Sequence, residues 1–469
     1  MKLLARLLVV VTLATLAAIP AATAADRMWM GFHDDPVFRW NDGRMDELDK
    51  AVFEHATIIR TLITWANVAP TKPASAADPF DPAYKLDDVD ELVRNAQQRG
   101  LEVLITIWGT PKWANGDKAP SYLPTNVNDF RQFAQAIAAR YSGRYPGYPF
   151  VRFYGVWNES NLGQFLAPQY SPSGAIIGPA AYAKLAAAAY TGIKAGNPKS
   201  LVAIGETSSH GRDKLLPGNS DTVSPGTFAQ LVAKANPRLK FDAWAHHPYP
   251  YPVFMRPAQK MKWGNVSLTS LPRFETSVDS WFHRKNIPIW ITEYGHETKP
   301  GEPIGVTEAQ QAAYIPQAVA LARKDPRVQM FIWFVFRDSA GSTWQSGLYH
   351  QTGTPKPALA RWRQVSPGLD ARNPSLTVKG GTKSPLVTLV VREICSTNAP
   401  GTSVGMTYRV FLGAKFVKVG QTSVALGKDC TVTARPAFTF AKSKTYTVVF
   451  NMNTYNGVII QRTATITGT

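Results

Sequence analysis

The sequence predicts an α/β protein in which a (β/α)8 barrel is followed by a small all-β sandwich of immunoglobulin-like size. Two observations support the barrel: eight short apolar segments run along the chain, and helical periodicity fills the gaps between them. A third observation supports the sandwich, because the composition changes after Pro367 to short alternating segments rich in Thr, Val, Ser and Gly. A chain of 469 residues is long enough for both parts.

The eight apolar segments have the character of parallel strands that are buried on both faces. They are rich in Val, Ile, Phe and Trp and do not alternate with polar residues. They are Met28–His33, Ala56–Trp65, Leu101–Gly109, Val151–Glu159, Leu201–Thr207, Phe241–Tyr249, Pro288–Tyr294 and Val328–Asp338. A doubly wound open sheet is the competing architecture. It usually has a glycine-rich phosphate turn after its first strand, and Gly31–Pro36 does not have that form.

Helices are predicted between these strands from apolar residues at helical spacing. The periodic segments begin near Leu86, Phe130, Tyr182, Tyr314 and Leu359. Their alternation with the strands gives the repeating strand–helix units that a barrel of this kind requires.

The N-terminal residues have the order of a secretory signal peptide. Lys2 and Arg6 are followed by an apolar run and then by Ala22-Thr-Ala24. A retained membrane anchor is the alternative, but the run is short and the small-residue cleavage pattern is good. We therefore expect a signal peptide over 1–24, a catalytic barrel domain over 25–369 and a sandwich domain over 370–469. The mature protein should be secreted or held in the cell envelope, without a transmembrane segment.

The C-terminal region carries two further predictions, one from its cysteines and one from its charge. Cys395 and Cys430 are the only cysteines, and in an exported chain two cysteines in one small domain indicate a disulfide. The whole chain has a formal charge of +18, and residues 371–469 contain twelve Lys and Arg against Glu393 and Asp429, which gives +10. Such a surface suits an anionic partner. Export favours an acidic polysaccharide or the cell envelope over nucleic acid, which we do not expect as a partner.

Polar residues end several of the predicted strands, where barrels of this type form their active sites. Asn158 and Glu159 end the fourth strand in the motif VWNESN, and Glu293 ends the seventh in WITEYG. A retaining glycosidase requires two facing carboxylates: one attacks the anomeric carbon, and the other protonates the leaving oxygen and then activates water. The nucleophile must stay ionised, and Arg60 in the second strand is a candidate to keep it so.

Each of these carboxylates has a plainer interpretation, because a Glu at the end of one strand is usually a solvated residue. Their occurrence together, on strands four and seven of an eight-strand pattern, favours catalysis. Glu206 ends the fifth strand and is a rival carboxylate, which we interpret as a substrate contact or a structural residue.

The sixth and eighth strands add further candidates. His246, His247 and Tyr249 end the sixth strand in HHPY, and Trp333 lies in the eighth. Adjacent strand residues point to opposite faces, so only one of the two histidines can face the barrel mouth. The H-x-Y spacing favours His247. The same divergence argues against a metal site at this pair, and we expect no metal or other cofactor.

The motifs VWNESN, WITEYG and HHPY, with Arg60 on the second strand, resemble those of the clan A glycoside hydrolases, in particular the family 5 cellulases and family 39-type enzymes. The resemblance covers roughly residues 26–368. It implies that Glu159 is the acid/base and that Glu293 is the nucleophile.

The resemblance also implies roles for the surrounding side chains. Asn158 would bind the sugar 2-hydroxyl, and Arg60 and Tyr249 would support the nucleophile. His247 would contact the substrate or the acid/base, and Trp333 would be a stacking platform for the innermost sugar.

These patterns together predict a secreted retaining glycoside hydrolase that cleaves O-glycosidic bonds, β-linked, of a poly- or oligosaccharide by double displacement. The alternative is a non-catalytic carbohydrate-binding or cell-envelope protein on a degenerate barrel. The intact pair of carboxylates and Arg60 favour the enzyme.

Overall fold

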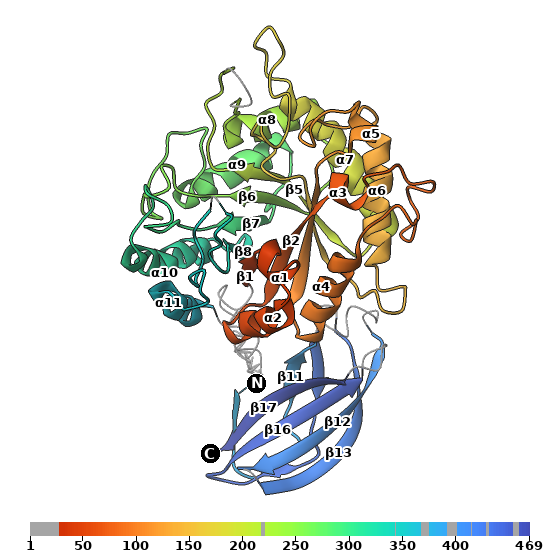
Figure 1. Cartoon of the computed structure of the whole chain (residues 1–469). Helices are drawn as coiled ribbons and strands as arrows, with labels where there is room; N and C mark the ends of the chain where they lie inside the picture. The colour runs from red at the N-terminus through yellow and green to blue at the C-terminus, as the bar shows by residue number, and fades with distance from the viewer. Residues whose placement is uncertain are drawn as a thin grey trace, which may run out of the picture.

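The computed structural model describes residues 28–216, 221–342, 344–366, 375–391, 401–413, 415–427, 431–453 and 459–469. Eight parallel strands close into a barrel in the order β1 to β8, with helices around it (Figure 1). The closure is direct, because β1 pairs with both β2 and β8. The predicted barrel is therefore confirmed, and the open sheet is excluded. The predicted signal peptide, its cleavage site, the boundary at 369–370 and both cysteines lie outside the described residues.

The barrel strands agree with the eight predicted segments and are shorter at most of their ends. They are β1 Trp29–His33, β2 Ile58–Thr64, β3 Glu102–Trp108, β4 Phe153–Val156, β5 Leu201–Ser208, β6 Ala243–His247, β7 Ile289–Tyr294 and β8 Val328–Phe334.

The helices that cover the barrel include those predicted from periodicity. They are α1 Asp35–Phe38, α2 Arg44–Phe53, α3 Trp65–Val68, α4 Asp87–Gln98, α5 Lys112–Asn115, α6 Val127–Arg140, α7 Gly178–Gly196, α8 Pro225–Ala235, α9 Leu271–Trp281, α10 Glu308–Lys324 and α11 Pro357–Val365, with a 3-10 turn, η3, at Leu268–Ser270. None of the helices among the described residues has both the length and the apolar character needed to cross a membrane.

The inside of the barrel changes from apolar to polar along the strands. The part nearer the strand N-termini holds a buried cluster of Ile58, Leu104, Phe153, Ala203, Ala243, Ala245, Trp290, Met330 and Ile332. Two residues further along their strands, where side chains again point inward, β2 carries Arg60, β3 carries Thr106 and β7 carries Thr292, and all three are fully buried. The polar layer therefore lies under the C-terminal mouth of the barrel.

The C-terminal region is all-β, as predicted. Its strands are β9 Ser375–Val378, β10 Thr382–Lys383, β11 Val387–Val390, β12 Ser403–Leu412, β13 Lys415–Ala425, β14 Thr431–Ala434, β15 Thr439–Phe440, β16 Thr445–Asn453 and β17 Ile459–Gly468. A five-stranded sheet in the order β13-β12-β16-β17-β9 shares one apolar core with the β11–β14 pair, which is consistent with a small sandwich. Figure 1 shows β13, β12, β16 and β17 side by side in this sheet.

Candidate active site

The polar layer of the barrel is organised around Arg60. Its guanidinium donates to Glu293 Oε1 at 2.5 Å and to Asn158 Oδ1 at 2.9 Å, and its Nε donates to Thr106 Oγ1 at 3.1 Å. Glu206 Oε2 lies 3.4 Å from Arg60 Nη2. A fully buried Arg needs such anionic neighbours, because an unpaired charge in this environment is very costly. Arg60 therefore fixes residues on β3, β5 and β7 and in the segment after β4 relative to one another.

Glu293, at the end of β7, is held by donors on two sides. Arg60 contacts one carboxylate oxygen, and the Tyr249 hydroxyl donates to the other at 3.1 Å. Burial and the charge of Glu293 raise the pKa of Tyr249 well above its ordinary value, so the phenol keeps the proton that it donates. Burial acts to raise the pKa of Glu293, but the positive charges of His247 and Arg60 lower it well below its ordinary value. Glu293 is therefore held as a carboxylate.

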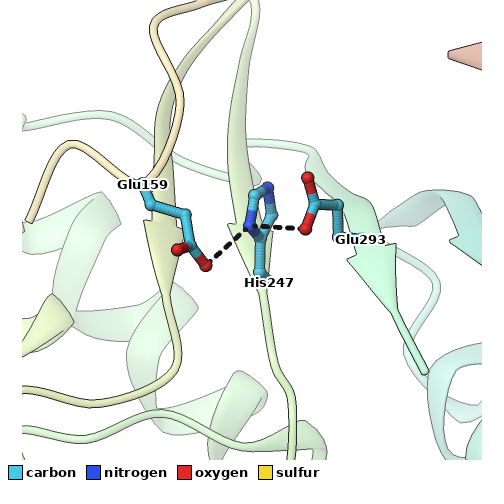
Figure 2. Close-up of side chains that lie close together, drawn as sticks. All are labelled: Glu159, His247 and Glu293. Atoms are coloured by element: carbon cyan, nitrogen blue, oxygen red, sulfur yellow. Dashed lines mark hydrogen bonds and ion pairs between the residues drawn. The ribbon is translucent and has the colours of Figure 1, made fainter. Parts of the chain in front are cut away.

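His247 lies between the two candidate catalytic carboxylates (Figure 2). Its Nδ1 is 3.2 Å from Glu159 Oε1 and 3.5 Å from Glu293 Oε2. Burial acts to lower the pKa of His247, but the charge of Glu293, with the hydrogen bonds that His247 donates to Glu159 and Glu206, raises it to about 9. The imidazole is therefore protonated at neutral pH and faces both carboxylates.

The two adjacent histidines separate as strand geometry requires. His246 points away from the mouth, where its ring nitrogens lie 2.9 Å from Thr207 Oγ1 and 3.0 Å from the Val266 carbonyl oxygen. Burial lowers the pKa of His246 to about 3, so this ring is neutral. The structure places His247, and not His246, beside the carboxylates.

A cavity of about 650 Å³ opens at the C-terminal ends of the strands. Glu159, Glu293, Asn158 and Tyr249 are among the residues that line it. Its wall also contains the loop aromatics Tyr251 and Trp344. The ring of Tyr251 stacks on His210, with centroids 3.8 Å apart and an interplanar angle of 16°. Aromatic surfaces of this kind suit the C–H faces of pyranose rings.

The role predicted for Trp333 is wrong. Trp333 has no exposed surface, its ring packs near Tyr294 and Trp362, and its Nε1 donates to the Ser346 carbonyl oxygen. The side chain therefore points out of the barrel into the surrounding helical layer and has no face free for a sugar. The next residue, Phe334, lines the cavity instead, and its ring centroid lies 5.9 Å from that of Trp344.

Sequence reasoning missed His33, which ends β1 and lines the cavity. Its Nδ1 lies 2.9 Å from Arg60 Nη1 and 3.5 Å from Glu293 Oε1. The signal was available in the sequence, because His33 is a polar residue at a strand end, as are Glu159 and Glu293.

Glu159, His247 and Glu293 each offer one ligand atom, and these atoms lie within 4.8 Å of one another. We assign no metal to them. Arg60 already supplies the positive charge beside Glu293, and the protonated His247 supplies a second one between the carboxylates. A metal ion would have to displace one of these cations or lie beside both.

Comparison with known proteins identifies the family. Residues 31–337 match the model of the cellulase family, glycosyl hydrolase family 5. The chain belongs to glycosyl hydrolase family 5. The matched region contains every barrel strand except the first residues of β1, so this family 5 barrel accounts for most of the chain, and the predicted clan A resemblance is confirmed.

Solved structures share the fold of this family 5 chain at low identity. A family 39 glycoside hydrolase from the gut symbiont Bacteroides cellulosilyticus WH2 has a TM-score of 0.54 and 18% identity, covering 89% of this chain and 83% of its own. The protein GH5_18 from Streptomyces cattleya, solved in complex with GlcNAc, has a TM-score of 0.52 and 15% identity, covering 76% of this chain and 85% of its own. No curated protein matches the chain.

Proposed function

We propose that this protein is a retaining β-glycosidase that cleaves O-glycosidic bonds of a poly- or oligosaccharide by double displacement. The observation that carries the proposal is that two carboxylates line one cavity, with one oxygen of Glu159 and one oxygen of Glu293 within 4.8 Å of each other. Retaining glycosidases hold their carboxyl groups about 5–5.5 Å apart, whereas inverting enzymes leave about 6.5–9.5 Å for a water molecule. Family 5 membership agrees with this chemistry.

Glu293 is the proposed nucleophile, because Arg60 and Tyr249 hold it ionised and oriented at the cavity. It attacks the anomeric carbon while Glu159 gives a proton to the departing oxygen, which forms a glycosyl–enzyme ester. Glu159 then takes a proton from water as that water attacks the anomeric carbon, and the bond between that carbon and the Glu293 oxygen breaks to release the Glu293 carboxylate. Arg60 donates a hydrogen bond to Asn158 Oδ1, and Asn158 Nδ2 is then the atom that can donate to a sugar hydroxyl.

The anomer of the first-formed product tests this function. Proton NMR during hydrolysis of an aryl β-glycoside or a β-glycan should show the β-anomer first, with the α-anomer appearing only by mutarotation. An α-anomer formed first would exclude double displacement. Purified protein that released no sugar from a broad panel of plant, fungal and bacterial glycans would instead support the non-catalytic carbohydrate-binding alternative.

We also propose that the protein is exported and that its C-terminal region attaches it to an anionic polysaccharide or cell-envelope surface. The charge of +10 over residues 371–469 supports this, because repulsion among like charges does not favour folding. Exposed lysines that carry part of this charge are Lys379, Lys383, Lys415, Lys418, Lys442 and Lys444.

Full-length protein should bind polygalacturonate or cell-wall fractions at low salt and elute by about half-molar salt, since screening shortens the range of exposed charges. Changing four C-terminal lysines to Gln should abolish retention: Lys415, Lys418, Lys442 and Lys444. The control changes four exposed barrel lysines: Lys184, Lys199, Lys240 and Lys285. Equal loss of retention in both variants would show that net charge, and not the C-terminal region, causes binding.

A further inference from the structure

Glu206 is a buried carboxylate that the proposed reaction does not use directly. It has no exposed surface and does not line the cavity, although it lies in the polar layer below it. Its position depends on an irregularity in β5, where the pairing with β6 shifts register between Gly205 and Thr207. Both Gly205 and Glu206 have positive φ, at 96° and 44°. Bulges of this kind re-aim a side chain, and here the bulge turns Glu206 into the barrel.

The neighbouring strand leaves room for this carboxylate. Gly155 on β4 faces it, and a β-carbon at Gly155 would collide with Glu206 Oε1 and Thr106 Oγ1. Two separate features of the backbone, a bulge on β5 and a glycine on β4, therefore admit one charged group into the barrel. A carboxylate that served only to fill space would not need both features.

The partners of Glu206 are the groups that position the candidate catalytic residues. Its Oε2 lies 3.1 Å from His247 Nε2 and 3.4 Å from Arg60 Nη2, and it accepts a hydrogen bond from Thr292 Oγ1 at 2.5 Å. A carboxylate accepts hydrogen bonds, so the proton of His247 is fixed on Nε2. The other ring nitrogen, Nδ1, is then presented to Glu159 and Glu293.

We propose that Glu206 is a positioning residue that fixes a proton on His247 Nε2 and so makes His247 Nδ1 and Glu159 share the proton that the leaving group receives. This inference rests on the proposed function of Glu159. The shared proton passes from Glu159 to the departing oxygen as the glycosidic bond breaks and the bond to Glu293 forms. The attacking water returns one proton to the pair in the second step, so the proton balance closes over one turnover.

The charges around His247 and Glu159 give the expected direction in which kcat/KM depends on pH. Four groups face His247. They are Glu206 on β5, Glu159 after β4, Glu293 on β7 and Tyr249 in the loop after β6. Glu206 in turn faces Arg60 on β2, with Tyr182 on α7 nearby. Burial acts to lower the pKa of His247, and the three carboxylates together raise it to about 9. The shared proton is therefore present below that pH and lost above it.

Glu206→Gln tests the proposal, because it keeps the size of the side chain and removes its charge. The alkaline limb of the kcat/KM profile, measured with an aryl β-cellobioside or whichever aryl β-glycoside the wild type turns over fastest, should move to lower pH by about one unit or more. At the wild-type optimum, kcat should fall about ten- to a hundred-fold with little change in KM. Nitrogen NMR should show the same downward shift of the His247 titration, with His247→Asn used to assign its signals.

Thr292→Val is a second variant with the opposite expectation. It removes a donor to Glu206 Oε2, which makes this oxygen a stronger acceptor for His247. The alkaline limb of the kcat/KM profile should therefore move to higher pH. The matched control is Glu54→Gln. Glu54 is 1% exposed and contacts Arg363 and Tyr349 instead of residues of the site. The alkaline limb of the kcat/KM profile of this variant should therefore be the same as in the wild type.

An unchanged limb and an unchanged His247 titration in folded Glu206→Gln would overturn the inference. If that variant does not fold, an unchanged limb in Thr292→Val would overturn it. These outcomes differ from failure of the proposed function, which would appear as wild-type turnover in Glu159→Gln or Glu293→Gln. The His247 titration reports on Glu206 in either case, because it requires no turnover.

Discussion

Replacing Glu293 by Gln should lower kcat by more than about ten-thousand-fold on any substrate of the enzyme, because no ester can form without the carboxylate. Steady-state assays with an aryl β-glycoside measure this loss. The fold should survive the change. Gln keeps an oxygen that can accept from Arg60, and Glu206 remains as a second carboxylate near the guanidinium.

Far-UV circular dichroism and thermal unfolding of Glu293→Gln provide the control for stability. Glu54→Gln removes another buried carboxylate that is paired with an Arg, and it should keep wild-type turnover. Wild-type turnover in Glu293→Gln would show that Glu293 is not the nucleophile. A variant that is inactive because it is unfolded would be recognised by its lost thermal transition.

Replacing Glu159 by Ala should cost about a hundred- to ten-thousand-fold in kcat/KM on substrates with poor leaving groups, because general acid catalysis is lost. The loss should be much smaller for a dinitrophenyl glycoside, whose leaving group needs no proton. On that substrate hydrolysis of the glycosyl–enzyme becomes slow, since no base activates water. Azide needs no base, so it should accelerate turnover and yield a β-glycosyl azide.

Glu293→Ala is the matched control for azide rescue. In that variant azide would attack the substrate directly and give an α-glycosyl azide. The anomeric configuration of the azide product therefore assigns the two carboxylates separately. A β-azide from Glu293→Ala and an α-azide from Glu159→Ala would reverse the two proposed roles.

The number and order of the barrel strands could be predicted because parallel strands buried on both faces are continuous apolar runs. The strand ends were less predictable. The sequence predicts a fourth strand from Val151 to Glu159, and β4 covers only Phe153–Val156. Trp157 and Glu159 take positive φ values of 73° and 38°, so the chain leaves the strand conformation where the functional residues begin. Local polarity does not reveal this turn.

At the site, the sequence predicts the direction of some side chains and not of others. His247 was favoured over His246 because H-x-Y spacing puts two polar residues on the same side. From Met330 to Phe334 every residue of β8 is apolar, so no alternation indicates that Phe334, and not Trp333, lines the cavity. For Glu206 the sequence indicates only a substrate contact or a structural residue, and it does not reveal the backbone bulge that turns this side chain inward.

The central claim is that Glu293 forms a covalent bond with the sugar. A deoxyfluoro glycoside with a good leaving group slows both steps, and hydrolysis of the ester more than its formation, so the intermediate should accumulate. Mass spectrometry of peptides from the inactivated enzyme should then find one sugar attached to Glu293, in the peptide that contains WITEYG. A sugar attached to Glu159 or Glu206, or complete turnover with inverted product and no adduct, would contradict the account.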